Sequence, residues 1–350
     1  MQRVEHIADL FRRSEQSDRA LIVYLLQAQL RPPYEGVEVR MGEKLLVKAL
    51  ALAYATRDAT VVGRLRTAGD LGLVAESLAP QRPRGRVTLS RAYDTLLAMA
   101  RAGGPGSLER KVSLLADLLQ LMSGIEAKVI VRVAQGRLPL GIGDQTILKA
   151  AALGALGDRK KHTLLEQAYN IRADLGNVVH LAFSKGARAL TAITPTIGVP
   201  VRPALAQRLS SARAIIKRLG EVQVEPKYDG FRLQLHRDGL RVWIFSRRLE
   251  DVTATFPELA AAARRQFTTQ RAIIEGEAVA YAPKTSAFLP FQMTMTRKRK
   301  RQVVEMAGRY PLRLFAFDVL YAGRTNYLAK TQRERSRALA RMLRVTRCDF

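Results

Sequence analysis

Cysteine is almost absent from this 350-residue sequence, in which Cys348 is the single example. One cysteine excludes an internal disulfide framework and any cysteine-rich zinc site. The four histidines are scattered along the sequence and offer no metal-ligand cluster. No apolar run reaches about 18 residues, and no hydrophobic signal core follows the first basic residue, so we expect a cytoplasmic protein without a membrane span.

Acidic residues are also scarce, because 31 Asp and Glu face 58 Lys and Arg, which gives a net charge of +27 and a pI near 10.9. Such an excess favours a polyanion as partner, since Lys and Arg release condensed counterions from phosphates. Nucleic acid is the first candidate and an anionic membrane the second. Hydrophobic residues make up 47% of the chain, which indicates a folded protein, and its length suggests about two domains.

Residues 19–189 are dominated by Leu and Ala at helical spacing, which predicts an all-helical first half. An example is the amphipathic stretch with Leu114, Leu115, Leu118, Leu119 and Leu121. Gly and Pro interrupt the pattern at residues 80–86 and 102–106, so we expect loops between helices there.

Two stretches of the helical half resemble each other. Residues 41–51 (MGEKLLVKALA) and 142–152 (IGDQTILKAAA) place Gly, an acidic residue, Lys and Ala at matching offsets, which suggests two copies of one unit. A glycine before a helix allows close backbone approach and leaves the first N–H groups free to bind phosphate. Taken alone, the pattern fits an ordinary glycine turn into a core helix at least as well.

Prolines and β-branched residues replace the helical pattern at residues 194–203, so we predict domains at 1–195 and 206–350 with a linker at 196–205. From Val222 onward apolar and polar residues alternate, which predicts strands joined in part by a turn at Asp238-Gly239. The apolar positions of these strands are Leu233, Leu235, Val242, Ile244, Ile273, Ile274, Val279 and Tyr281.

The hexapeptide KYDGFR at residues 227–232 lies at the junction of two predicted strands. A lysine amine can attack the α-phosphorus of a nucleotide when it is deprotonated, and fixed positive charge nearby lowers its pKa while stabilising the phosphate. Arg232, Arg247 and Arg248 could supply that charge. The missing Cβ at Gly230 would let a nucleotide approach the backbone. A plain hairpin with surface charges is the alternative.

K-x-D-G-x-R resembles motif I of the covalent nucleotidyltransferases, which include DNA ligases, RNA ligases and mRNA capping enzymes. The following segments resemble later motifs in the family's order: 245–253 (FSRRLEDVT) motif Ia, 274–280 (IEGEAVA) motif III and 314–321 (LFAFDVLY) motif IIIa. This resemblance implies that Lys227 becomes covalently adenylated by ATP. By motif position it also implies that Glu225 contacts the adenine edge, that Arg232 and Arg247 contact phosphate or ribose, that Glu277 contacts ribose or Mg²⁺, and that Phe317 stacks on adenine.

The helical half is similar to the DNA-binding domain of archaeal and eukaryotic-type ATP-dependent DNA ligases, notably at residues 34–43 and 124–133. In that family both glycine-preceded helix ends contact the duplex. The resemblance implies DNA contacts at Gly42, Lys44, Lys48, Gly143 and Lys149. Pro139 departs from the family, which usually has an arginine there. The basic run at residues 297–301 is typical of a solvated loop, and in a ligase it would bring Arg297, Lys298 and Arg299 to DNA phosphates.

Motifs IV to VI of the family, together with its oligonucleotide-binding barrel, are not found after Phe317. We therefore expect a truncated, multi-domain protein, with an all-α DNA-binding domain followed by an incomplete α+β nucleotidyltransferase domain of ATP-grasp-like type. The expected function is that of an ATP-dependent DNA ligase, a monomer that seals nicked duplex DNA in replication, repair and recombination. Two alternatives stay open: an RNA-acting nucleotidyltransferase and a non-catalytic DNA-binding remnant. An NAD-dependent ligase is disfavoured because its nicotinamide-recognising front domain is missing.

Overall fold

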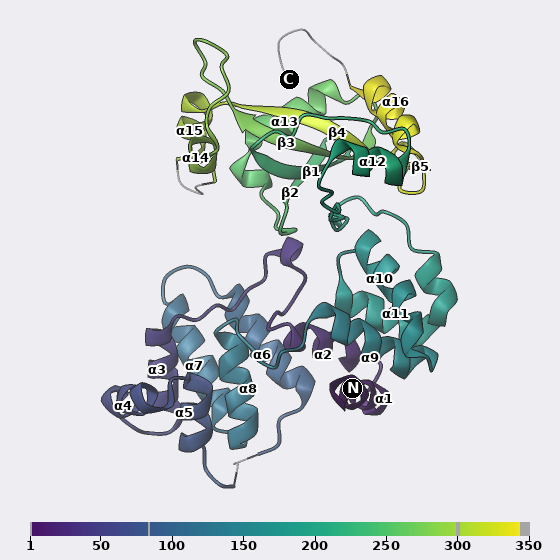
Figure 1. The fold of residues 1–350 in the computed structure, drawn as a ribbon. Coiled ribbons are helices and arrows are strands. Elements are labelled where there is room, and N and C mark those ends of the chain that lie inside the picture. The colour runs from purple at the N-terminus through teal and green to yellow at the C-terminus, as the bar shows by residue number, and fades with distance from the viewer. Residues whose placement is uncertain (1, 83–84, 299–301, 344–350) are drawn as a thin grey trace. The chain divides into compact units, whose positions relative to one another are not determined.

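A computed structural model describes residues 2–82, 85–298 and 302–343 of the chain. The chain divides into two compact units (Figure 1). Unit 1 comprises Met1–Tyr169 and Asp174–Ala192, and unit 2 comprises Asn170–Ala173 and Ile193–Phe350.

Unit 1 is built from helices in its described residues, and its helical region begins earlier than the sequence predicted, at Gln2. The α-helices are α1 (Gln2–Arg13), α2 (Asp18–Leu26), α3 (Glu43–Ala53), α4 (Asp58–Ala68), α5 (Leu71–Leu78), α6 (Leu89–Arg101), α7 (Ser107–Leu119), α8 (Gly124–Ala134), α9 (Asp144–Leu156), α10 (His162–Ile171) and α11 (Leu175–Thr191). Two short 3-10 helices are η1 (Pro33–Glu35) and η2 (Arg159–Lys161).

The helices of unit 1 follow from apolar stripes and caps. On α7, Leu115, Leu118 and Leu119 are buried in a core shared with the helices around it, which confirms the predicted amphipathic stretch. Helix α8 begins with a capping box in which Ser123 and Glu126 satisfy each other's backbone N–H groups. The predicted loop at residues 102–106 joins α6 to α7.

The two copies of the repeated sequence form α3 and α9. Each helix has a glycine at its N-cap, with extended backbone at Gly42 (φ −69°, ψ 158°) and Gly143 (φ −100°, ψ 171°) and no side-chain cap. Burial also repeats, because Leu46 and Ile147 occupy matching core positions. The repeat seen in the sequence is therefore a repeat of structure.

Unit 2 has an antiparallel sheet with the strand order β2-β1-β3-β4-β5. The strands are β1 (Phe231–Asp238), β2 (Arg241–Ser246), β3 (Arg271–Ala280), β4 (Leu312–Ala322) and β5 (Thr325–Asn326). The helices are α12 (Ala212–Leu219), η3 (Thr253–Thr255), α13 (Pro257–Gln266), α14 (Phe291–Thr296), α15 (Val303–Arg309) and α16 (Gln332–Met342). Gly239, with φ 60°, forms the predicted turn between β1 and β2.

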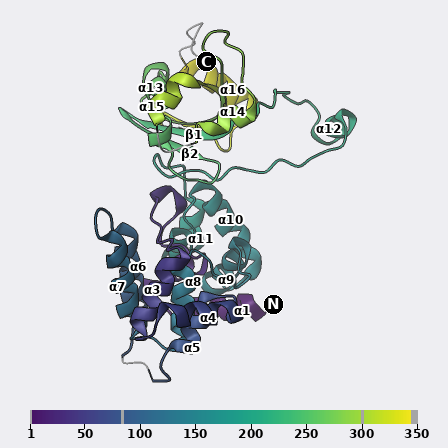
Figure 2. The same cartoon turned by 90° about the vertical axis from the view of Figure 1, so that its left-hand side faces the viewer.

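The two faces of the sheet differ. Leu233 and Leu235 of β1 point to an apolar core that α13 and α16 help to form. The residues that alternate with them, including Arg232 and Gln234, lie on the opposite face, which we call the polar face. Helix α12 joins neither layer: none of its residues is buried, and Figure 2 shows it at the end of two extended segments, away from the sheet.

One predicted strand does not form. Residues 222–229 carry no strand assignment, and Val224 is 86% exposed. The alternation of apolar residues is present there, but a strand needs a hydrogen-bonded neighbour, and β1 is already paired on both sides by β2 and β3. KYDGFR therefore begins in an extended loop and ends in β1, instead of joining two strands.

Candidate active site

The motif residues meet on the polar face of the sheet because register places them side by side. Arg232 of β1 lies opposite Glu277 of β3, and Glu277 lies opposite Phe315 of β4. The backbone N–H of Gly230 donates to Glu277 Oε1 at 3.2 Å, which fixes the end of the lysine loop against β3. Three segments that are distant in sequence thus share one small surface.

Glu277 is the carboxylate at the centre of this surface. Burial raises the pKa of Glu277 above its ordinary value of 4.5, while the Gly230 N–H and the charges of Lys227 and Arg232 act in the opposite direction. Asp229 also raises this pKa, so both the lysine and a second acid lie within electrostatic reach of Glu277. Lys227 and Asp229 are exposed, so Glu277 is the partly buried member of this group of charges.

Arg232 is held from two sides. Its guanidinium donates to Glu275 Oε2 in an ion pair, and it lies 5.7 Å from the centroid of the Phe317 ring. Phe317 is thus on the same surface as the lysine loop, beside the arginine predicted to contact phosphate or ribose. Both side chains keep partial exposure, as a ligand-contacting group requires.

An aromatic group that the sequence reading missed adjoins the lysine. The ring of Tyr228 stacks on Phe315 with centroids 3.8 Å apart and planes 14° apart, and Phe288 packs edge-on against Phe315 at 5.3 Å. The stacked pair holds the lysine loop against β4. The alternation Phe315-Ala-Phe317 in a strand could have indicated that both rings share a face with the motif residues.

Lys227 and Glu225 lie on the exposed loop that precedes β1. Glu225 Oε1 accepts a hydrogen bond from Gln223 Nε2 at 2.6 Å, so its partner in the structure belongs to the same loop. The structure brings Lys227 to the polar face through Tyr228 and Gly230, and it leaves Glu225 two residues further from the sheet.

Gly230 has a different role from the one the sequence suggested. A Cβ at this position would lie 2.3 Å from the carbonyl oxygen of Ala278 on the neighbouring strand. The backbone of β3, not a nucleotide, is what requires glycine here. The residue allows the lysine loop to close onto the sheet.

Arg247 follows β2 and is exposed, and it lines a shallow groove together with Arg232, Glu275 and Pro200. The groove lies on the polar face of the sheet, so the motif I and motif Ia arginines open onto the same depression. The predicted phosphate or ribose contacts of Arg232 and Arg247 stay a prediction, with both side chains lining one groove.

The basic run departs from its predicted role at Arg297. The side chain of Arg297 is fully buried, forms an ion pair with Glu258, and donates to the carbonyl of Val303. A guanidinium enclosed in this way contacts protein and not a phosphate in solvent. Lys298 ends the described part of this segment and is exposed, while Arg299 lies outside the described residues.

The residues predicted to contact DNA lie at the starts of α3 and α9. Lys44 and Lys48 are exposed one turn apart on α3, and Lys149 is the half-buried counterpart of Lys48 on α9. A Cβ added at Gly42 or Gly143 would meet nothing within 4 Å. Packing within the described residues therefore does not require glycine at either position, and the space over both helix starts is open.

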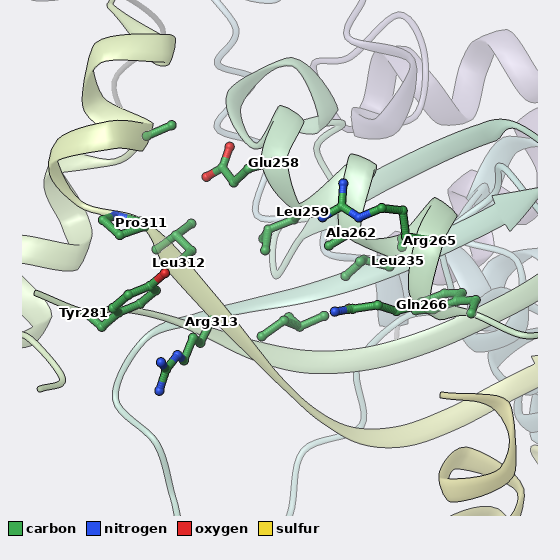
Figure 3. Close-up of a pocket in the computed structure, with 14 residues that line it drawn as sticks. Leu235, Glu258, Leu259, Ala262, Arg265, Gln266, Tyr281, Pro311, Leu312 and Arg313 are labelled. Atoms are coloured by element: carbon green, nitrogen blue, oxygen red, sulfur yellow. The ribbon is translucent and has the colours of Figure 1, made fainter. Parts of the chain in front are cut away.

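A separate cavity of about 190 Å³ lies on the opposite face of the sheet, between α13 and the start of β4 (Figure 3). Its wall includes Leu235, Glu258, Gln266 and Arg313. None of the residues predicted to contact the nucleotide lines it, so the cavity is not part of the candidate site.

The described residues contain no group of three or more His, Cys, Asp or Glu side chains that could hold a metal ion. Glu277, with Asp229 within electrostatic reach, is the carboxylate arrangement closest to the motif lysine. Mg²⁺ is commonly held by one or two carboxylates together with substrate phosphates, so this donor set fits a magnesium–nucleotide complex and not a metal held by protein alone. No helix in the described part is long and apolar enough to cross a membrane.

Helices followed by a sheet, with the motif lysine on the loop that leads into β1, define the class of the chain: a helical region joined to a nucleotidyltransferase domain. Family comparison agrees, since a family described as "DNA ligase N terminus" matches residues 1–152 and one described as "ATP dependent DNA ligase domain" matches residues 203–349. The chain belongs to the ATP-dependent DNA ligase family.

Among curated proteins, a probable DNA ligase of Dictyoglomus turgidum is 40% identical over 91% of this chain and 54% of its own length. A DNA ligase of Staphylothermus marinus is 39% identical over 97% of this chain and 60% of its own length. The chain thus spans between half and two-thirds of these relatives. Mycobacterial DNA ligase D complexed with ATP and MES is 26% identical over 35% of this chain and 38% of that one, with a TM-score of 0.27, which is too low to support an argument.

Proposed function

We propose that this chain is the DNA-binding and adenylation part of an ATP-dependent ligase that seals nicks in duplex DNA. Residues 1–195 bind the duplex and residues 206–350 take up AMP from ATP. Residues 196–205 join the two in sequence, and within them Gly198 and Val201 are hydrogen-bonded to the sheet of unit 2. The DNA 5′-phosphate then attacks the phosphorus of the bound AMP and displaces the amine of Lys227. The neighbouring 3′-hydroxyl attacks the resulting DNA-adenylate, forms the phosphodiester bond and releases AMP. The observation that carries the proposal is the meeting of Lys227, Arg232 and Glu277 on the polar face.

In the first step, the uncharged amine of Lys227 attacks the α-phosphorus of ATP. A nitrogen–phosphorus bond forms, the bond to the bridging oxygen breaks, and pyrophosphate leaves. Arg232 and Arg247 are placed to stabilise the negative charge that develops on the phosphate oxygens. The Glu275 carboxylate fixes the orientation of Arg232, so this charge is in place before the reaction begins.

The remaining nucleotide contacts are assigned to residues by their positions in the family motifs. Phe317 offers an aromatic face for the adenine, and Glu225 offers a carboxylate for its amino edge. Glu277 is assigned to the ribose or to Mg²⁺, which supplies positive charge at the phosphates when bound. Burial raises the pKa of Glu277, which means that its charged form lacks solvation. A bound cation or a ribose hydroxyl would stabilise that charged form in place of water.

For the duplex, we assign phosphate contacts to the first N–H groups of α3 and α9, with Lys44, Lys48 and Lys149 beside them. The support is the repeated, uncapped helix start and the open space over Gly42 and Gly143. Exposed Lys298 is a further candidate, whereas buried Arg297 is withdrawn. We assign the activity to nicks in chromosomal DNA during replication, repair and recombination.

The experiment that tests this function is covalent labelling. The chain is incubated with ATP carrying a radioactive α-phosphate and Mg²⁺, then denatured and resolved on a gel. We expect acid-labile label on the wild type and none on Lys227→Ala, because this variant lacks the amine that is proposed to attack the α-phosphorus. Lys217→Ala, an exposed lysine of α12, is the matched control and retains the label. Label that persists on Lys227→Ala refutes the assignment.

A further inference from the structure

Gln234 lies at the centre of a buried hydrogen-bond network behind the candidate site. Its side chain is only 6% exposed. Gln234 Nε2 donates to the carbonyl of Val201 at 3.0 Å and to Glu275 Oε1 at 3.0 Å, while Oε1 accepts from the N–H of Val201 at 2.8 Å and from His236 Nε2 at 2.8 Å. A glutamine amide has two donor hydrogens and two acceptor sites, so all four are satisfied.

The protonation of His236 agrees with this assignment. The N–H of Gly198 donates to His236 Nδ1 at 3.0 Å, so the ring hydrogen is on Nε2, where it donates to Gln234. Burial lowers the pKa of His236 to about 3, so the ring is neutral at physiological pH and holds one donor and one acceptor.

Residues 197–202, which we call the strap, are attached to the sheet by this network. Both backbone polar groups of Val201 bind Gln234, and its side chain packs with Ile273 and Leu320. Gly198 is bound by His236 and lies against the ring of Trp243, the only tryptophan of the sequence.

The network continues to the arginine of the candidate site. Glu275 uses one carboxylate oxygen for Gln234 and the other for Arg232. Glu275 is only 7% exposed, so the orientation of its carboxylate is set by these two donors and not by water. The strap, Gln234, Glu275 and Arg232 therefore form a continuous chain of hydrogen bonds.

We propose that Gln234 and Glu275 are positioning residues for the nucleotide, through which the docked strap sets the orientation of Arg232. This inference rests on the proposed function, because it concerns ATP bound next to Lys227. We assign neither residue a contact of its own with the nucleotide. Gln234 fixes one oxygen of Glu275, and the second oxygen then holds the guanidinium where it meets a phosphate or ribose oxygen.

Glutamine is the side chain that this position requires. A glutamate would lose both donors and place a second carboxylate beside Glu275, and a methionine would keep the volume but lose all four hydrogen bonds. At position 275, glutamine keeps the shape of glutamate but removes the charge that holds Arg232. The variants Gln234→Met and Glu275→Gln thus interrupt the chain at two successive links.

The test measures AMP transfer to Lys227 in single-turnover experiments across ATP concentrations, with Trp243 emission as a readout of strap docking. We expect Glu275→Gln to raise the half-saturating ATP concentration about 10- to 100-fold, in the range seen when groups supporting a ligand-binding side chain are removed, with unchanged emission. Gln234→Met should raise it similarly and shift the emission to longer wavelength, because the strap is released. Glu258→Gln is the matched control, since it weakens another Glu–Arg ion pair on the opposite face of the sheet, and it should change neither quantity.

A half-saturating ATP concentration equal to wild type in Glu275→Gln overturns the role of Glu275. A shifted emission with wild-type ATP dependence in Gln234→Met overturns the link to the strap. An equal loss in Glu258→Gln shows a general structural effect and also overturns the proposal. If the wild type itself takes up no AMP, the proposed function fails, and this outcome is distinct from labelled wild type with unchanged variants.

Discussion

Glu277 shows how a single residue can be suited to function and unfavourable for stability. Its carboxylate is partly buried, and that burial raises its pKa. A raised folded-state pKa means that the folded protein binds the proton more tightly than the unfolded chain does. The contribution of this residue to stability is therefore fully present below the ordinary pKa of 4.5 and is lost as the pH rises through the folded value.

We predict that Glu277→Gln stabilises the protein at pH 7.5 and abolishes adenylation. Glutamine keeps the acceptor for the Gly230 N–H but carries no charge that must be desolvated. Tm should rise by about 2 °C at pH 7.5, and the difference should vanish near pH 4. Calorimetry at the two pH values measures this. A Tm at pH 7.5 below that of the wild type contradicts the prediction.

At the scale of elements, the segment after α14 shows that adjacent basic residues can have opposite environments. Arg297 follows α14 and forms an ion pair with Glu258 in the first turn of α13. Its guanidinium carbon lies 5.9 Å from the ring centroid of Phe256. Lys298, the next residue, is exposed. The sequence alone suggests the same solvent-exposed role for every residue of the basic run. At the end of α14, however, the side chain of Arg297 is buried and that of Lys298 is exposed.

We predict that Arg297→Ala destabilises unit 2 by about 3 kcal/mol, because Glu258 is left partly buried without its partner. Lys298→Ala should leave the stability of the fold within about 0.5 kcal/mol of wild type, as surface changes do. Urea unfolding followed by far-ultraviolet circular dichroism measures both. Equal stability of the two variants would show that Arg297 is not held in the structure as described.

At the scale of the whole molecule, charge is the dominant property. A net charge of +27 provides a long-range attraction to any polyanion, but it does not say which residues contact phosphate. The helix starts of α3 and α9 concentrate backbone N–H groups and lysines at two matching places in unit 1. Binding of the duplex should therefore depend on a few of the many cations.

We predict that Lys44→Ala combined with Lys48→Ala reduces the slope of log affinity against log salt for nicked duplex by about 2, since each phosphate contact contributes about 0.9. The loss should be the same for unrelated DNA sequences. Arg110→Ala with Lys111→Ala on α7 removes the same charge and serves as the control. Fluorescence anisotropy at several salt concentrations gives the slopes, and equal changes in the two double variants would refute a localised contact.

The sequence by itself determined the helical first half, the strands that carry Leu233, Ile244 and Ile274, and the repeated helix starts. These features are local, because periodicity and caps act within a few residues. Sequence also gave the motif order and hence the candidate residues. The family of the chain likewise follows from its sequence, which matches two DNA ligase family models.

Only the tertiary structure decided which neighbours these residues have. The missing strand at residues 222–229, the packing of Gly230 on Ala278, and the burial of Arg297 all depend on contacts with segments distant in sequence. The same holds for Gln234, whose four hydrogen bonds go to three residues, one in the strap, one in β1 and one in β3. Residue identity fixes what a side chain can donate, accept or bury, but strand register and packing fix what it meets.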